Sequence, residues 1–241
     1  FEVAVAADPN FALAHAALSR VFASLAAQNA KASDLKPLYS AAVQQAERAI
    51  ELAPKLADGH LALGYARFAG FLDVRGAKPS YDKAYQFGRG DADIILLYAS
   101  YTVRARRFAQ ARDAIERALA LDPLNPRTHR ASGMIAYLSR RYADAVAGFR
   151  QALRLNPEIS TANAFLGNAL MLQNKLQEAR TAILAEKSDM FRLTSLAILE
   201  YRAGNSAAAQ SALDSLVAKL GDAAVYQQAE VMAQFGKVNE A

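Results

Sequence analysis

The chain has 241 residues, of which 53% are hydrophobic, and it carries a formal net charge of +5. This composition supports a large core and excludes wholesale disorder. The absence of cysteine excludes disulfides, thiolate metal sites and a cysteine nucleophile. Helix-favouring residues dominate and period-two alternation is nearly absent, so the predicted fold class is all-α.

Four prolines in similar turn segments divide the chain into units. The segments read "AADPN", "LAPKL", "LDPLN" and "LNPEI", with the prolines at positions 9, 54, 123 and 157. Pro123 and Pro157 are 34 residues apart, and Pro54 and Pro123 are separated by two such units without a middle proline. The first interval contains one unit with eleven extra residues. Such a period indicates a repeat architecture.

Small residues recur at fixed distances from these prolines. Five residues before the proline stand Ala4, Ala49, Ala118 and Ala152. Twelve residues before it stand Ala42, Ala111 and Ala145. Ten residues after it stand Ser19, Gly64, Gly133 and Gly167. Tiny side chains let two helices approach closely, so these columns are typical of packed helical pairs.

Together these columns resemble the tetratricopeptide repeat (TPR), a unit of about 34 residues that forms two antiparallel helices. The most specific matches are Ala145, Phe149, Ala152, Pro157, Leu166 and Gly167. The resemblance implies a right-handed superhelical solenoid of about fourteen helices, with residues 1–241 as a single array. Regular repeats are expected to about residue 187 and degenerate TPR-like helix pairs over 188–241. Because both ends lie within helical pattern, we expect a fragment of a longer protein.

Two segments depart from the regular spacing. Residues 26–37 are expected to lengthen one helix and then loop, with Asp34 as a helix cap and Pro37 in the first turn of the next helix. Residues 68–81 are expected to replace the usual short turn. Both features resemble TPR arrays at the C-terminal ends of bacterial regulators, behind a winged-helix, nucleotide-cyclase or kinase domain.

The sequence offers no catalytic, metal or cofactor site. His15, His60 and His129 each lie six residues after a repeat proline. Equivalent positions in stacked helices are roughly 10 Å apart, too far for a shared metal ion. We interpret them as packing residues. The carboxylates fit no general acid–base pair, and "FGRGDAD" is interpreted as a turn between helices.

In the TPR family the first helix of each pair lines a concave groove that binds peptides or partner helices. The groove positions here include Tyr65, Phe68, Arg104, Arg127, Arg130, Met134, Tyr137, Asn168 and Met171. Aromatic residues, Met and Arg are enriched at interface cores. Asn168 corresponds to an asparagine of the family's chaperone-tail binders, but Met134 and Ser100 replace further asparagines, which disfavours a carboxylate clamp. The alternative is that these residues only pack or face solvent.

A second candidate surface is a basic edge formed by turn residues. It comprises Arg106, Arg107, Arg140, Arg141 and Lys175, which recur at the repeat spacing. Residues 101–150 contain ten basic and four acidic residues, an excess that suits an acidic protein partner more than a nucleic acid. Ordinary solvated turn charge is the alternative.

We therefore predict a non-enzymatic scaffold that binds a protein or peptide, with an acidic partner favoured. No nucleic acid is expected to bind this segment, and no apolar run approaches the ~20 residues that span a bilayer. The alternatives are a regulatory domain of a transcription regulator or nucleotide cyclase, and an accessory region of a transferase. The oligomeric state and the compartment stay open, the cytoplasm being favoured over the periplasm.

Overall fold

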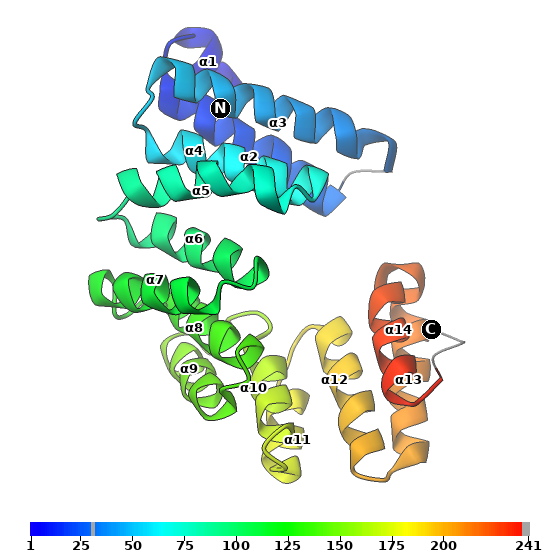
Figure 1. The fold of residues 1–241 in the computed structure, drawn as a ribbon. Helices are drawn as coiled ribbons and strands as arrows, with labels where there is room; N and C mark the ends of the chain where they lie inside the picture. The colour runs from blue at the N-terminus through cyan, green and yellow to red at the C-terminus, as the bar shows by residue number, and fades with distance from the viewer. Residues whose placement is uncertain (30–31, 238–241) are drawn as a thin grey trace. The chain divides into compact units, whose positions relative to one another are not determined.

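A computed structural model describes residues 1–29 and 32–237 and is built from α-helices (Figure 1). The described residues contain no β-strand, which confirms the predicted all-α class. The chain divides into two compact units, Phe1–Pro123 and the residues from Leu124 onward. Within the described residues, no helix combines the length and the apolar character that crossing a membrane requires.

The first unit consists of antiparallel helix pairs that follow one another along the chain. Its helices are α1 (Glu2–Ala7), α2 (Ala12–Asn29), α3 (Ala32–Leu52), α4 (Ala57–Phe71), α5 (Val74–Phe87), α6 (Ala92–Arg104) and α7 (Phe108–Leu121). Helices α2 and α3, α4 and α5, and α6 and α7 pack against each other as pairs. Neighbouring pairs join through the first helix of the later pair, since α4 contacts both α2 and α3, and α6 contacts both α4 and α5.

The second unit repeats this arrangement. Its helices are α8 (Pro126–Leu138), α9 (Tyr142–Leu155), α10 (Ala162–Met171), α11 (Leu176–Leu184), α12 (Asp189–Arg202), α13 (Ser206–Leu220) and α14 (Val225–Gln234), with a 3-10 turn at Gly221–Ala224. Helices α8 and α9, α10 and α11, and α12 and α13 form pairs. The first helices again contact one another, because α10 touches α8 and α12, and α12 touches α14.

The small-residue columns mark the points of closest helix packing. All the alanines of the two columns except Ala4 are fully buried. A methyl group added at Gly133 would lie 2.8 Å from the Phe149 ring, and one at Gly167 would lie 2.4 Å from Ile183. No carbon pair tolerates such distances, so only glycine permits these crossings. The repeat register derived from the prolines is therefore confirmed.

A left-handed residue follows α6, α8, α10, α12 and α14 and provides a second repeating column. Arg106, Arg140 and Asn174 have φ values of 60°, 60° and 61°, and Gly204 and Gly236 take the same place further on. In every case the next residue donates its N–H to the carbonyl five residues earlier, at 2.8–3.0 Å. This is the Schellman helix ending. It continues past residue 187, where the proline column stops.

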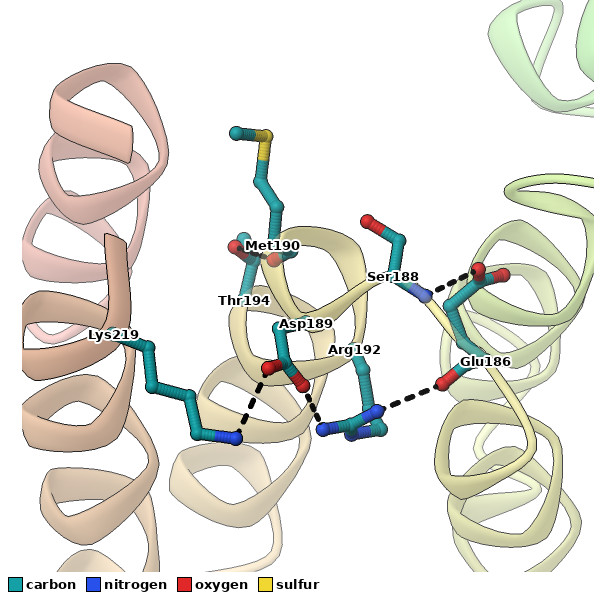
Figure 2. Close-up of polar contacts among 7 residues, drawn as sticks. All are labelled: Glu186, Ser188, Asp189, Met190, Arg192, Thr194 and Lys219. Atoms are coloured by element: carbon teal, nitrogen blue, oxygen red, sulfur yellow. Dashed lines mark hydrogen bonds and ion pairs between the residues drawn. The ribbon is translucent and has the colours of Figure 1, made fainter. Parts of the chain in front are cut away.

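The link between α11 and α12, which contains no proline, is closed by polar contacts instead (Figure 2). Glu186 is only 4% exposed. Its carboxylate accepts hydrogen bonds from the N–H groups of Ser188, at 3.1 Å, and Ala164, at 3.3 Å. The Glu186 carboxylate thereby joins the start of α10 to the start of α12. Arg192 adds a hydrogen bond to the Glu186 carbonyl oxygen at 3.1 Å.

Asp189 extends this network to α13. Its carboxylate accepts a hydrogen bond from the Lys219 ammonium group at 3.0 Å and another from Arg192 on its own helix (Figure 2). The hydrogen bond from Lys219 and the charge of Arg192 hold the pKa of Asp189 below its usual value. The ion pairs thus fix α12 against its partner helix without a proline-marked turn.

Two expectations about the irregular segments were wrong. Helix α3 begins at Ala32, so Asp34 lies inside its first turn rather than at the cap, and Pro37 lies further along the helix. An acidic residue in the first turn suits the helix dipole, and a proline near the start costs few backbone hydrogen bonds. The loop expected within residues 26–37 includes residues 30 and 31, which lie outside the described residues.

The expected long connection at residues 68–81 is instead a two-residue turn. Helix α4 continues to Phe71 and α5 starts at Val74. Leu72 adopts a left-handed φ of 53°, and Asp73 caps α5 by accepting a hydrogen bond from the Gly76 N–H at 2.7 Å. The capping aspartate sets the start of α5, so Pro79 falls inside the helix.

Candidate partner-binding surfaces

The histidine column serves the packing of the repeats. His15 and His60 are 6% and 3% exposed. Their Nε2 atoms lie 3.1 and 2.9 Å from the carbonyl oxygens of Pro9 and Pro54, respectively, each six residues earlier. Each ring therefore ties its helix to the preceding proline turn. His129, in the same column, is half-buried.

The second unit contains a pocket of about 160 Å³, which we call the second-unit pocket. Its lining comes from α8, α10, α12 and α14 and from the residue after α10, and comprises Tyr137, Asn168, Met171, Leu172, Ile198, Arg202, Glu230 and Gln234. Tyr137, Asn168 and Met171 are groove residues that the sequence predicted. The structure brings these three side chains together at one pocket.

Asn168 provides an unsatisfied acceptor at this pocket. Its Oδ1 atom is buried and has no hydrogen-bond partner among the residues that the structure describes. An unpaired buried polar group of this kind costs about 1–3 kcal/mol. Because Oδ1 has almost no exposed surface, the Asn168 side chain would have to turn toward the pocket before a ligand could donate an N–H or O–H group to it and remove this cost.

Charged groups surround the same pocket. Burial, together with Tyr142 and the Glu230 carboxylate, raises the pKa of Tyr137, while Arg202 acts in the opposite direction. The Tyr137 phenol is therefore neutral at physiological pH. Burial also raises the pKa of Glu230. Arg202 is exposed and forms no ion pair within the described part of the chain, which leaves its guanidinium group accessible.

The first unit contains a larger pocket of about 270 Å³, the first-unit pocket. It is lined from α2, α4, α5 and α6 by Arg20, Ser24, Leu61, Ala62, Tyr65, Tyr81 and Leu97. Tyr65 belongs to the predicted groove set, and Arg20 and Leu61 stand at equivalent predicted positions, eleven and seven residues after a repeat proline. Phe68 packs edge-on against Tyr101, with ring centres 5.6 Å apart, and Arg104 donates to the Ser100 carbonyl oxygen at 2.8 Å.

The middle of the chain matches a family model. The model described as "Tetratricopeptide repeat" matches residues 99–149 and 133–190. Residues 99–190 are therefore similar to tetratricopeptide repeats. Comparison with curated proteins gave no match.

Solved structures similar to this chain include TPR proteins and pilus factors. PilF of Pseudomonas aeruginosa is 19% identical, with a TM-score of 0.64 over 92% of this chain and 99% of that chain. PilW, a widely conserved type IV pilus biogenesis factor, is 20% identical, with a TM-score of 0.70 over 89% and 98%. YrrB, a TPR protein with an unusual peptide-binding site, is 17% identical, with a TM-score of 0.53 over 79% and 99%. At these identities the similarity shows the fold.

The remaining predicted groove residues of the second unit lie on α8 but do not line its pocket. Met134 packs against the core, and the Arg130 guanidinium donates to the Thr161 hydroxyl at 3.4 Å. Arg127 is exposed. Counting forward from the repeat proline therefore finds the right helix and only some of the lining residues.

Sequence reasoning missed five lining residues, mostly on α12 and α14, where the prolines are absent. The left-handed turn column supplies the signal that finds them. Six residues before each turn residue of the last three turns stand Asn168, Ile198 and Glu230, and two residues before stand Leu172, Arg202 and Gln234. All six line the pocket. Glycine at positions 204 and 236 marks the register that proline no longer marks.

The predicted basic edge consists of residues at these TPR turns. Arg106 and Arg140 occupy the left-handed position and are exposed. Arg141 forms an ion pair with Asp144 at 3.3 Å, and Lys175 is exposed just before α11. Arg107 is half-buried, and one of its guanidinium nitrogens is buried without a partner among the described residues. The edge residues thus share a backbone role in ending and starting helices, and an acidic partner for them stays a prediction.

Proposed function

We propose that this chain is a non-enzymatic scaffold whose second-unit pocket binds a segment of a partner protein. The observation that carries this proposal is the buried, unpaired Asn168 Oδ1 atom at a pocket lined by the first helices of successive TPR pairs. A peptide backbone offers N–H donors at regular intervals, and each can satisfy such an acceptor. The peptide-binding site ascribed to YrrB, of the same fold, also supports the proposal.

The charges of the pocket select for an acidic residue in the partner. Arg202 offers two parallel donors that match a carboxylate. Arg127 and Arg130 lie on α8, one of the helices that line the pocket, and extend the basic character of this surface. Glu230, on α14, also lines the pocket and accepts donors such as a lysine or an amide. Met171 and Ile198 supply apolar contact in the same lining.

The alternatives suggested by the sequence would use the same surface. A regulatory domain of a bacterial regulator, or an accessory region of a transferase, would hold a neighbouring domain or partner where we place a peptide. No observation in the described residues favours either alternative, and both stay predictions.

The proposal can be tested with peptides selected from a displayed random library on the whole chain. Affinity of a selected peptide is then measured by fluorescence anisotropy for the wild type, Arg202→Glu and the matched control Lys175→Glu. Loss of a charge-assisted contact at Arg202 should weaken binding by about tenfold or more. The control, which makes the same charge change on the basic edge, should change it by less than about twofold.

The opposite pattern would overturn this placement. If Lys175→Glu loses the peptide and Arg202→Glu retains it, the basic edge is the binding surface. If the library yields no peptide whose binding depends on either residue, the scaffold does not act through these surfaces.

A further inference from the structure

The first-unit pocket has a rigid apolar floor. Leu61, Ala62 and Tyr81 line it and are at most 3% exposed. The Tyr81 ring stacks on Tyr101 with centres 4.0 Å apart and planes within 8°. The Tyr101 hydroxyl donates to the Val74 carbonyl oxygen at 2.7 Å, which fixes the stack. A pocket whose walls are already held in place loses little conformational entropy on binding.

Gly64 contributes to the rigidity of this floor from the other side. A methyl group at Gly64 would lie 2.8 Å from the Tyr81 ring, so the backbone of α4 is in direct contact with that ring. The Tyr81 ring is thus held between the α4 backbone and Tyr101. Its position depends on the same small-residue column that sets the TPR register.

The mouth of the first-unit pocket is cationic. Arg20 lines it, is exposed, and forms no ion pair with the residues that the structure describes. Arg104 is also exposed and lies close enough to Tyr81 to influence its titration. Burial is the main cause that raises the pKa of Tyr81, so its phenol stays neutral and does not offset these charges. Tyr65, 37% exposed, adds a further hydroxyl group at the lining.

The size of the pocket limits its occupant. Its volume of about 270 Å³ lies just below the range of roughly 300–1,000 Å³ for drug-sized ligands. One large side chain fits this space better than a complete cofactor. Burial of one aromatic or aliphatic side chain removes a large apolar surface from water, which makes it an effective anchor for a peptide.

We infer that the first-unit pocket receives one large apolar side chain of a partner protein segment whose neighbouring aspartate or glutamate pairs with Arg20. The apolar floor matches the side chain, and the cationic mouth matches the carboxylate. Charge complementarity selects an acidic partner segment over a basic one. The inference rests on the proposed scaffold function and adds a second contact, independent of the second-unit pocket.

The test uses the whole chain with ¹³C-labelled leucine methyl groups and three synthetic peptides with blocked ends. The peptides are acetyl-Gly-Glu-Phe-Glu-Gly-amide, the same peptide with Ala for Phe, and the same peptide with Lys for both Glu. The first should shift the NMR signals of the Leu61 and Leu97 methyl groups in a saturating titration. The other two should bind about tenfold more weakly or not at all.

Matched charge reversals on the protein complete the test. Arg20→Glu should weaken binding of the Glu-Phe-Glu peptide by about tenfold. Lys55→Glu, an equal charge change at an exposed residue outside the pocket, should alter it by less than about twofold. Both side chains are exposed, so neither variant disturbs the core.

Three results would overturn the inference: no saturating shift, equal binding of all three peptides, or an equal loss with Lys55→Glu. Phenylacetate serves as a further probe, and binding as tight as that of the peptide would show that the pocket takes small acids instead. The Arg202→Glu variant leaves the first-unit pocket intact, so the two tests are independent. If the Glu-Phe-Glu peptide does not bind while a library-selected peptide still depends on Arg202, only this inference is refuted. Loss of both would refute the scaffold function as well.

Discussion

The two pockets use the same repeat position for different chemistry. Tyr65 and Asn168 both stand eleven residues after a repeat proline, and each lines the pocket of its own unit. Around Tyr65 the lining is mainly apolar, and the Arg20 guanidinium at the mouth forms no ion pair with the described residues. Around Asn168 it contains an unpaired amide oxygen, a guanidinium group and the Glu230 carboxylate. The repeat therefore determines where a pocket forms, and the residue at the variable column determines what the pocket accepts.

The largest expected effect comes from disturbing the helix crossings on which both pockets depend. Gly133→Leu would drive a side chain into Phe149, and Ala145→Leu would do the same at a fully buried position. Each should destabilise the chain by about 3 kcal/mol, since overpacking a close crossing forces the helices apart. Thermal unfolding followed by circular dichroism measures this.

Gly90→Leu is the matched control, because a methyl group at Gly90 has no heavy atom within 4 Å. Its midpoint should stay close to that of the wild type. Midpoints of Gly133→Leu and Ala145→Leu within a degree or two of the wild type would refute the repeat register and, with it, the shared column of Tyr65 and Asn168.

A smaller loss is expected where the second unit differs from the proline-marked turns. Glu186→Leu removes the carboxylate that accepts the Ser188 and Ala164 N–H groups and leaves a buried and a half-buried donor unpaired. We expect a loss of about 1–3 kcal/mol in the free energy of unfolding, measured by urea denaturation. Glu158→Leu, which removes only an exposed ion pair with Lys187, should cost less than about 1 kcal/mol. Equal losses would show that Glu186 does not hold this link.

The sequence predicts the proline-marked repeats better than the segments without a repeat proline. Composition predicted the all-α class. Prolines and small residues predicted the helix pairs and the close crossings at Gly133 and Gly167, because those positions are constrained by sterics. The prediction of a long connection between α4 and α5 was wrong because it relied on the proline at position 79 and did not consider Asp73 as a helix cap. Arg202 and Glu230 were missed because no proline marks their repeats.

The side-chain details of the pockets lie beyond sequence reasoning. Whether Asn168 Oδ1 finds a partner depends on the packing of α12 and α14 around it, and the stack of Tyr81 on Tyr101 depends on the approach of α5 to α6. A repeat column identifies which residue faces the neighbouring helix. It does not identify the side chain or hydrogen-bonding group that this residue meets there.

The smallest expected effect concerns acid stability in the second unit. The hydrogen bond from Lys219 lowers the folded-state pKa of Asp189, so its contribution to stability is present above its unfolded pKa of about 4 and is lost as the pH falls through the folded value. Asp189→Asn should therefore flatten the fall in unfolding midpoint below about pH 4. Asp122→Asn provides a comparison outside this network. If the unfolding midpoint of Asp189→Asn falls with pH as steeply as that of the wild type, the role of the ion pair is contradicted.

The most direct test of a binding role for the second unit is the stability and the peptide affinity of Asn168→Leu, measured together. If Asn168 serves a ligand, replacing its unpaired buried oxygen with an apolar group of similar size leaves the unfolding midpoint unchanged or raises it. The same variant should lose about tenfold or more in affinity for a library-selected peptide. A chain that becomes less stable while it binds the peptide as well as the wild type would show that Asn168 is a packing residue and that the second-unit pocket is not the binding site.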